Sequence, residues 1–88
     1  ELTMESVVVP PGCPLAGKPL VELDQIRKVG VQLGGIRRGR QRRLSPAGQD
    51  QFREGDELLV LGTHEQIKAF AVLLSPPPAE ATGPGESS

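Results

Sequence analysis

The basic charge of this chain is concentrated in one short segment. Five of its ten Lys and Arg residues fall within seven positions, whereas the acidic residues are spread along the chain and the net charge is only −1. A guanidinium group presents a planar fork of donors that matches a phosphate or carboxylate with two hydrogen bonds. An anion site is therefore the first hypothesis for this segment, which contains Arg37, Arg38, Arg40, Arg42 and Arg43.

The residues around these arginines predict a β-hairpin. Apolar residues outline a strand over 31–36, Gly39 permits a tight turn, and residues 40–44 return as a second strand. Gly34 and Gly35 predict a bulge or a close approach of another backbone. Because successive side chains of a strand point to opposite faces, we expect about half of the guanidinium groups on each face.

Three interpretations of this basic hairpin remain open. It could be a solvated hairpin that keeps the domain soluble, a site for an anion or nucleotide, or a contact with a partner protein or a membrane surface. Sequence-specific DNA binding is disfavoured because no predicted recognition helix carries the charge. The chain also has two Phe and no Trp or Tyr, so it lacks a stacking platform for single-stranded bases. We therefore expect no nucleic-acid partner.

Acidic residues cluster in a predicted turn that follows the hairpin. They could bind a cation, but they lack the regular alternation of oxygen ligands and the central Gly of a calcium loop. A cation site at this turn is the alternative to an anion site at the hairpin. The acidic residues are Asp50, Glu54, Asp56 and Glu57.

The remaining candidates for chemistry are isolated residues. His64 is the only histidine and is expected in the exposed first turn of a helix, without other ligands at metal-binding spacing. Cys13 is the only cysteine and lies in a Pro-rich loop, where a small structural residue is expected rather than a nucleophile. Because the chain has a single cysteine, an intrachain disulfide is excluded. The sequence contains no catalytic constellation, so we expect no enzyme activity and no cofactor other than a nucleotide ligand.

The other elements predict the layer that supports the hairpin. A strand over 7–9 stops at a Pro-Pro-Gly turn, and a helix over 19–29 has an apolar stripe and a left-handed cap at Gly30. A strand over 57–61 leads into a second helix, which begins with the Thr63 to Gln66 capping box. These elements predict an α+β fold with a small mixed or antiparallel sheet of about four strands and two helices on one face.

The chain divides into one predicted domain and a tail. Residues 1–74 form the domain, whereas 75–88 contain Pro, Gly and Ser without a large apolar residue and are predicted to be a flexible tail. A domain of this size buries a smaller fraction of its surface than a larger domain does, so association with a second copy is expected to stabilise it. No segment approaches the roughly 18 consecutive apolar residues of a membrane span. The start at Glu1 suits a fragment of a longer protein.

Three segments in this order and spacing resemble the RCK-C (TrkA-C) domain, the regulatory lobe of bacterial potassium channels and cation-proton antiporters. They read Leu-Ala-Gly-Lys-Pro-Leu-Val-Glu-Leu over 15–23, Gly-Val-Gln-Leu-Gly-Gly-Ile-Arg-Arg-Gly over 30–39, and Glu-Gly-Asp-Glu-Leu-Leu-Val-Leu-Gly over 54–62. The resemblance implies a cytoplasmic homodimer tethered to the inner face of the membrane through a transporter or channel subunit. It implies a regulatory role as a sensor of a small anionic ligand or nucleotide; a plain dimerisation module is the alternative.

The resemblance also implies where a ligand would bind. In members that bind cyclic di-adenosine monophosphate, apolar residues at the end of a strand, a following Arg and an Asn hold the nucleotide. Ile36 matches the apolar position, but Gly35 stands beside it and the chain contains no Asn, which argues against that particular nucleotide. The predicted ligand-binding residues are Ile36, Arg37, Arg38, Arg40, Arg42 and Pro46.

Overall fold

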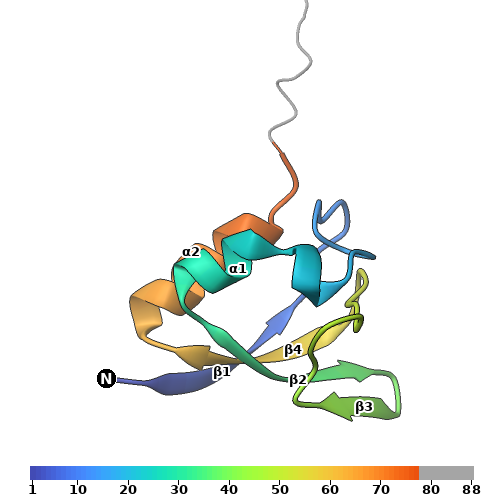
Figure 1. Cartoon of the computed structure of the whole chain (residues 1–88), viewed down its shortest axis with the longest axis horizontal. Coiled ribbons are helices and arrows are strands. Elements are labelled where there is room, and N and C mark those ends of the chain that lie inside the picture. Colours follow the sequence, from blue (N-terminus) through green and yellow to red (C-terminus); the bar gives the residue numbers. More distant parts are fainter. Residues whose placement is uncertain (78–88) are drawn as a thin grey trace, which may run out of the picture.

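A four-stranded antiparallel sheet forms one layer of the molecule, and the helices lie on one of its faces (Figure 1). This computed structural model describes residues 1–77. The strand order is β1-β4-β2-β3, so β1 and β3 are the edges. The elements in chain order are β1 (Thr3–Val8), the 3₁₀ helix η1 (Leu20–Glu22), α1 (Asp24–Val29), β2 (Gln32–Arg38), β3 (Gln41–Leu44), β4 (Glu57–Gly62) and α2 (His64–Leu74).

The central strand β4 is the apolar strand of the sheet, and both of its neighbours run antiparallel to it. Leu58 and Val60 point into the core and are fully buried. The predicted strand over 7–9 is longer and starts at Thr3, because β1 pairs with β4 from Thr3 opposite Gly62 to Val8 opposite Glu57. The fold class predicted from the sequence is confirmed.

The predicted bulge lies in β2. The register between β2 and β4 shifts between Leu33 and Gly35, so Gly34 is the extra residue. A Cβ atom at Gly34 would lie 3.0 Å from Leu61 Cδ1, so a side chain at this position would force its neighbour to move. The absence of a side chain at Gly34 therefore lets Leu61 keep its position beside the bulge.

The predicted helix over 19–29 is interrupted and was wrong as a single element. Residues 20–22 form η1, α1 begins at Asp24, and Leu23 between them has φ −100° and ψ 70°. The sequence repeats apolar residues three apart at Leu20, Leu23 and Ile26, which is also the repeat of a 3₁₀ helix. The break lets both Leu23 and Ile26 reach the core, where they are 3% and 7% exposed. Gly30 ends α1 with φ 95°, as predicted.

Helix α2 begins where the capping box predicts. The Thr63 hydroxyl accepts the Gln66 backbone N–H at 3.1 Å, and the Gln66 side chain accepts the Thr63 backbone N–H at 2.9 Å. The apolar stripe of this helix packs on β1 and β4 and on α1. Its inward residues are Ile67, Phe70 and Leu74.

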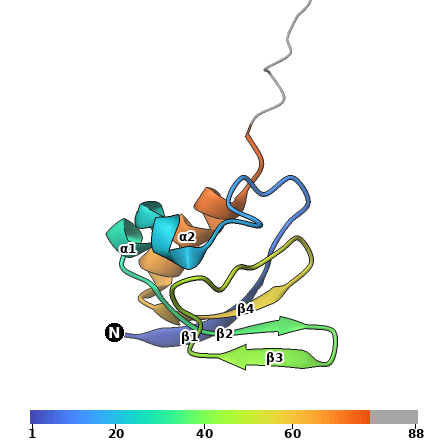
Figure 2. The same ribbon diagram turned by 45° about the vertical axis from the view of Figure 1, so that its right-hand side comes forward.

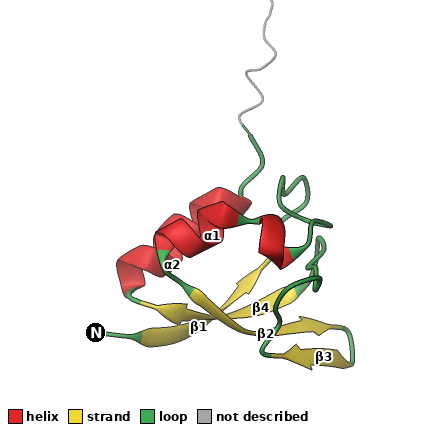
Figure 3. Cartoon of the chain, viewed as in Figure 1, coloured by secondary structure: helices red, strands yellow, loops and turns green. Residues whose placement is uncertain are grey.

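The helices cover only one end of the sheet, and loops cover the other end of that face (Figures 2 and 3). The β2–β3 hairpin extends beyond the helices toward these loops (Figure 2). None of the helices within residues 1–77 is long and apolar enough to cross a bilayer. Of the predicted tail over 75–88, only 75–77 lie within the described residues.

Candidate functional site

The five arginines of the β2–β3 hairpin are divided between the two faces of the sheet. Arg37 of β2 lies opposite Arg42 of β3, and Ile36 lies opposite Arg43. Ile36 is buried on the helix side, so Arg43 lies on that side as well, whereas Arg37 and Arg42 lie on the open face. The hairpin therefore does not gather all of its guanidinium groups at one point.

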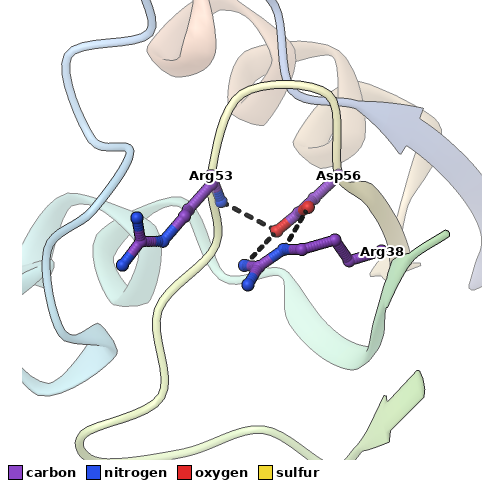
Figure 4. A network of polar contacts seen from close by, with 3 residues as sticks. All are labelled: Arg38, Arg53 and Asp56. Atoms are coloured by element: carbon purple, nitrogen blue, oxygen red, sulfur yellow. Dashed lines mark hydrogen bonds and ion pairs between the residues drawn. The ribbon is translucent and has the colours of Figure 1, made fainter. Parts of the chain in front are cut away.

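Arg38 binds the buried carboxylate of Asp56 at the end of β2 (Figure 4). Its Nε and Nη2 donate to the two carboxylate oxygens at 2.8 and 2.7 Å. Asp56 is only 1% exposed and also accepts the backbone N–H of Arg53 at 2.8 Å, while the Arg53 guanidinium points away (Figure 4). The Arg38 hydrogen bond, followed by the Arg53 N–H, holds the pKa of Asp56 below its usual range. The same pair raises the pKa of Arg38.

Two further arginines of the hairpin form more exposed ion pairs. On the open face, Arg37 Nη2 lies 2.5 Å from Glu57 Oε1, and the two residues are direct cross-strand partners. On the helix side, Arg43 Nη2 lies 2.7 Å from Asp50 Oδ1. The predicted acidic turn is therefore the internal counterion of the predicted basic hairpin.

This pairing contradicts the alternative of a cation site at the acidic turn. The carboxylates of Asp50, Asp56 and Glu57 bind arginines, and Glu54 accepts the backbone N–H of Gly12 at 3.0 Å. No group of three or more His, Cys, Asp and Glu residues within 1–77 is arranged to hold a metal ion. The sequence contained a signal for this result, because a basic run over 37–43 precedes an acidic run over 50–57 that can neutralise it.

Arg40 and Arg42 form no ion pair within the described part of the chain. Arg42, on the edge strand β3, lines a hollow with a volume of about 470 Å³ beside the hairpin, which we call the arginine hollow, and it also lines a depression on the open face together with Arg37. Arg40 follows the Gly39 turn at the hairpin tip and does not line this hollow. The hollow combines one apolar residue, guanidinium groups, one carboxylate and two amide side chains, and its lining residues are Ile36, Arg38, Gln41, Arg42, Arg43, Asp50 and Gln51.

Pro46 lies in a different depression. The segment 45–48 forms one wall of an apolar groove of about 500 Å³, and η1, α1 and the start of β2 form the rest. Leu23, Ile26 and Leu33 contribute apolar surface to this groove. The structure thus brings Ile36, Arg38 and Arg42 together and separates them from Pro46, which the sequence could not resolve because both sets follow β2 closely in the chain.

The isolated residues are placed as the sequence predicts. The His64 side chain is 78% exposed at the first position of α2 and lies 3.8 Å from the Glu5 carboxylate. Cys13 is 7% exposed and packs in the hydrophobic core as a free thiol.

Solved structures share this fold. The RCK_C domain dimer of Streptococcus agalactiae BusR in complex with c-di-AMP aligns with a TM-score of 0.74 at 17% identity, covering 81% of this chain and 93% of that one. The RCK C domain of the potassium transport protein KtrA in complex with the same nucleotide aligns with a TM-score of 0.70 at 22% identity, and the alignment covers 82% of each chain. The GsuK channel bound to NAD aligns with a TM-score of 0.68 at 25% identity. The alignment covers 83% of this chain but only 13% of the channel chain.

These structures overturn the expectation that nucleic acid is excluded as a partner. BusR in complex with its busAB promoter DNA aligns with a TM-score of 0.74 at 17% identity, and the chain covers 35% of that protein. A domain of this fold therefore occurs in a protein that binds DNA. The sequence argument failed because it judged only the surface of this domain, whereas the longer BusR chain has regions that this domain does not match.

The family model agrees with the fold. No curated protein sequence matches the chain. The model of the TrkA-C domain matches residues 4–75, which is most of the chain and includes both α-helices and all the strands except the first residue of β1. The resemblance of the three sequence segments is thereby confirmed, and this chain belongs to the TrkA-C domain family.

Proposed function

We propose that this chain is a regulatory domain that acts as a dimer and senses a small anionic ligand or nucleotide at the arginine hollow. The observation that carries the proposal is the charge left over after the internal pairing. Arg37, Arg38 and Arg43 have acidic partners, whereas Arg40 and Arg42 have none within residues 1–77. Of these two permanently charged residues, Arg42 lines the hollow, whereas Arg40 lies at the hairpin tip outside it.

The composition of the hollow suits a nucleotide better than a metal ion or a purely apolar ligand. Guanidinium groups bind phosphate oxygens with two hydrogen bonds, and the side-chain amides of Gln41 and Gln51 can donate to a base or sugar as well as accept from it. Ile36 offers apolar contact in the lining of the site. The KtrA and BusR structures, which hold c-di-AMP, support a nucleotide as the ligand class.

We further propose that the parent protein is a potassium or other cation transport protein and that the domain lies in the cytoplasm, tethered to the membrane through it. The KtrA and GsuK structures favour this parent. A DNA-binding regulator is the second candidate, and the BusR promoter complexes favour it. In both cases the domain itself carries out no catalysis, and its ligand shifts the balance between two arrangements of the dimer.

Thermal unfolding against a nucleotide panel tests this proposal. The panel contains c-di-AMP, NAD and ATP, with adenosine as the uncharged control. A ligand that binds only the folded state adds about 2.7 kcal/mol of stability at 100 times its dissociation constant. We expect at least one phosphate-containing compound to raise the melting temperature and adenosine to leave it unchanged. If none of the three raises it, the plain dimerisation module is the better description.

A further inference from the structure

The side chain of Asp50 connects the arginine hollow to the apolar groove. Its Oδ1 atom binds Arg43 Nη2 at 2.7 Å, and its Oδ2 atom accepts the backbone N–H of Ala47 at 2.9 Å. Arg43 lines the arginine hollow, whereas Ala47 lies in the wall of the apolar groove. One carboxylate therefore contacts both depressions.

The backbone around Asp50 is fixed independently of this carboxylate. The Asp50 carbonyl accepts the Leu20 N–H, and the Gly48 carbonyl accepts the Val21 N–H, both at 2.9 Å. These bonds attach the loop to η1. The carboxylate can therefore exchange its partners while the loop remains anchored.

The two ion pairs on the helix side differ in how easily they exchange. The Asp56 side chain is 2% exposed, but the Arg43 and Asp50 side chains are 67% and 20% exposed. Exposed ion pairs contribute little free energy, whereas a buried carboxylate that loses its partner is strongly destabilised. The Ala47 N–H and then Arg43 lower the pKa of Asp50, so its carboxylate is charged at neutral pH. Asp50 is thus the replaceable anion of the hairpin, and Asp56 is the permanent one.

We propose that Asp50 is a built-in competitor for the anionic ligand and that its displacement transmits binding from the arginine hollow to the apolar groove. This inference rests on the proposed function and adds how ligand binding at the arginine hollow is regulated. A phosphate group carries a charge of about −1.5 to −2 at neutral pH and three acceptor oxygens, so it replaces a single carboxylate at Arg43. The displaced Asp50 then loosens its hydrogen bond to the Ala47 N–H, which changes the wall of the apolar groove at Ala47, while the bonds of the Ser45 N–H and the Gly48 carbonyl keep the rest of the wall in place.

The test uses inorganic pyrophosphate and the full chain with Asp50→Asn. An Asn side chain still offers an oxygen to the Ala47 N–H, so the turn is kept while the negative charge beside Arg43 is removed. We expect pyrophosphate to bind this variant about three- to fivefold more tightly than wild type, the range that an exposed ion pair supports. Glu57→Gln is the matched control, because it removes the one negative charge that pairs with Arg37 on the open face of the same hairpin. It should change the affinity less than about twofold, since it removes no competitor and acts only through screened charge.

Backbone amide NMR provides the second readout. Pyrophosphate should shift the Ala47 amide in wild type and leave it unchanged in Asp50→Asn, where the amide side chain no longer pairs with Arg43. An equal gain of affinity in Asp50→Asn and Glu57→Gln would reduce the effect to net charge and overturn the inference. Wild-type binding without a gain in Asp50→Asn would also overturn it and leave the proposed function standing. If neither protein binds pyrophosphate, both the inference and the proposed anion site fail.

Discussion

Arg38 and Asp56 join the end of β2 to the residue before β4 through two parallel hydrogen bonds of 2.8 and 2.7 Å. The Asp56 carboxylate that accepts these bonds is almost completely buried, and it accepts a third hydrogen bond from the Arg53 backbone N–H. The Arg38 guanidinium that lines the arginine hollow is therefore part of the fold as well as of the candidate site. An anionic ligand has to use the neighbouring arginines, because removing Arg38 from Asp56 would leave a buried charge without a partner.

Asp56→Asn should lower the free energy of unfolding by about 1.5–3 kcal/mol, the range for a hydrogen bond to a charged group. Arg38→Lys keeps the positive charge but loses the two-point geometry, so it should lower that free energy by about half as much. Urea unfolding followed by circular dichroism measures both. Glu57→Gln is the control, because it breaks the exposed neighbouring pair and should cost at most about 1 kcal/mol. A loss for Asp56→Asn no larger than that of Glu57→Gln would show that the buried pair does not hold β2 to β4.

The contribution of Asp56 should depend on pH in one direction. Its pKa in the folded protein lies below the value of about 3.9 for an unfolded Asp, so its stabilising effect is present above that value and is lost as the pH falls through the folded pKa. The difference in unfolding free energy between wild type and Asp56→Asn should be constant between about pH 5 and 7 and should shrink below about pH 4. Urea unfolding at a series of pH values measures this difference. If the difference in unfolding free energy between wild type and Asp56→Asn grew as the pH falls, this result would contradict the assigned ion pair.

Phe70→Ala should lower the free energy of unfolding by about 3–5 kcal/mol, because Phe70 is fully buried between α2 and the sheet. His64→Ala, on the exposed side of the same helix, should change it by less than about 0.5 kcal/mol. Equal effects of the two substitutions in urea unfolding would show that α2 is rotated relative to the structure described here.

The domain should form a homodimer at micromolar concentration. The BusR RCK_C domain is a dimer, and the open face of this sheet exposes Leu44 on one edge strand, which is 76% accessible, and Met4 on the other edge strand, at 57%. Equilibrium sedimentation should give about twice the chain mass of 9.4 kDa. Leu44→Glu should weaken the dimer, because it places a charge on this face. Val72→Glu is the control on the outer side of α2, where a similarly exposed apolar residue lies away from the sheet. A mass near 9.4 kDa at all concentrations would contradict the prediction.

Local sequence signals predicted the fold well because each one is decided within a few residues. The Thr63 to Gln66 capping box, the Gly30 cap and the bulge at Gly34 depend on neighbouring backbone and are all confirmed. The break at Leu23 was missed because apolar residues three apart satisfy both an α-helix and a 3₁₀ helix. Only the packing of Leu23 and Ile26 into the core decides between them.

The candidate site was less predictable because it depends on contacts between distant segments. The sequence showed a basic run and an acidic run as rival sites, yet strand register places Arg37 beside Glu57, and the loop after β3 places Asp50 beside Arg43. Alternation along the strands was predicted correctly, but it disperses the arginines instead of concentrating them. The placement of Pro46 in a separate groove required the course of the 45–48 segment over η1.

The central claim is that an anion binds at the arginine hollow through the hairpin arginines that lack an internal partner. The direct test is an amide NMR titration of wild type and Arg40→Glu/Arg42→Glu with the nucleotide that gives the largest thermal shift. We expect the amides of 36–43 and Gln51 to shift in wild type, with affinity falling as salt screens the charges over about 8 Å at physiological ionic strength. The double variant should fold, because exposed substitutions usually change stability by less than about 0.5 kcal/mol, and it should lose binding. Shifts confined to the apolar groove around 20–23 and 45–48, with equal affinity in both proteins, would contradict the account.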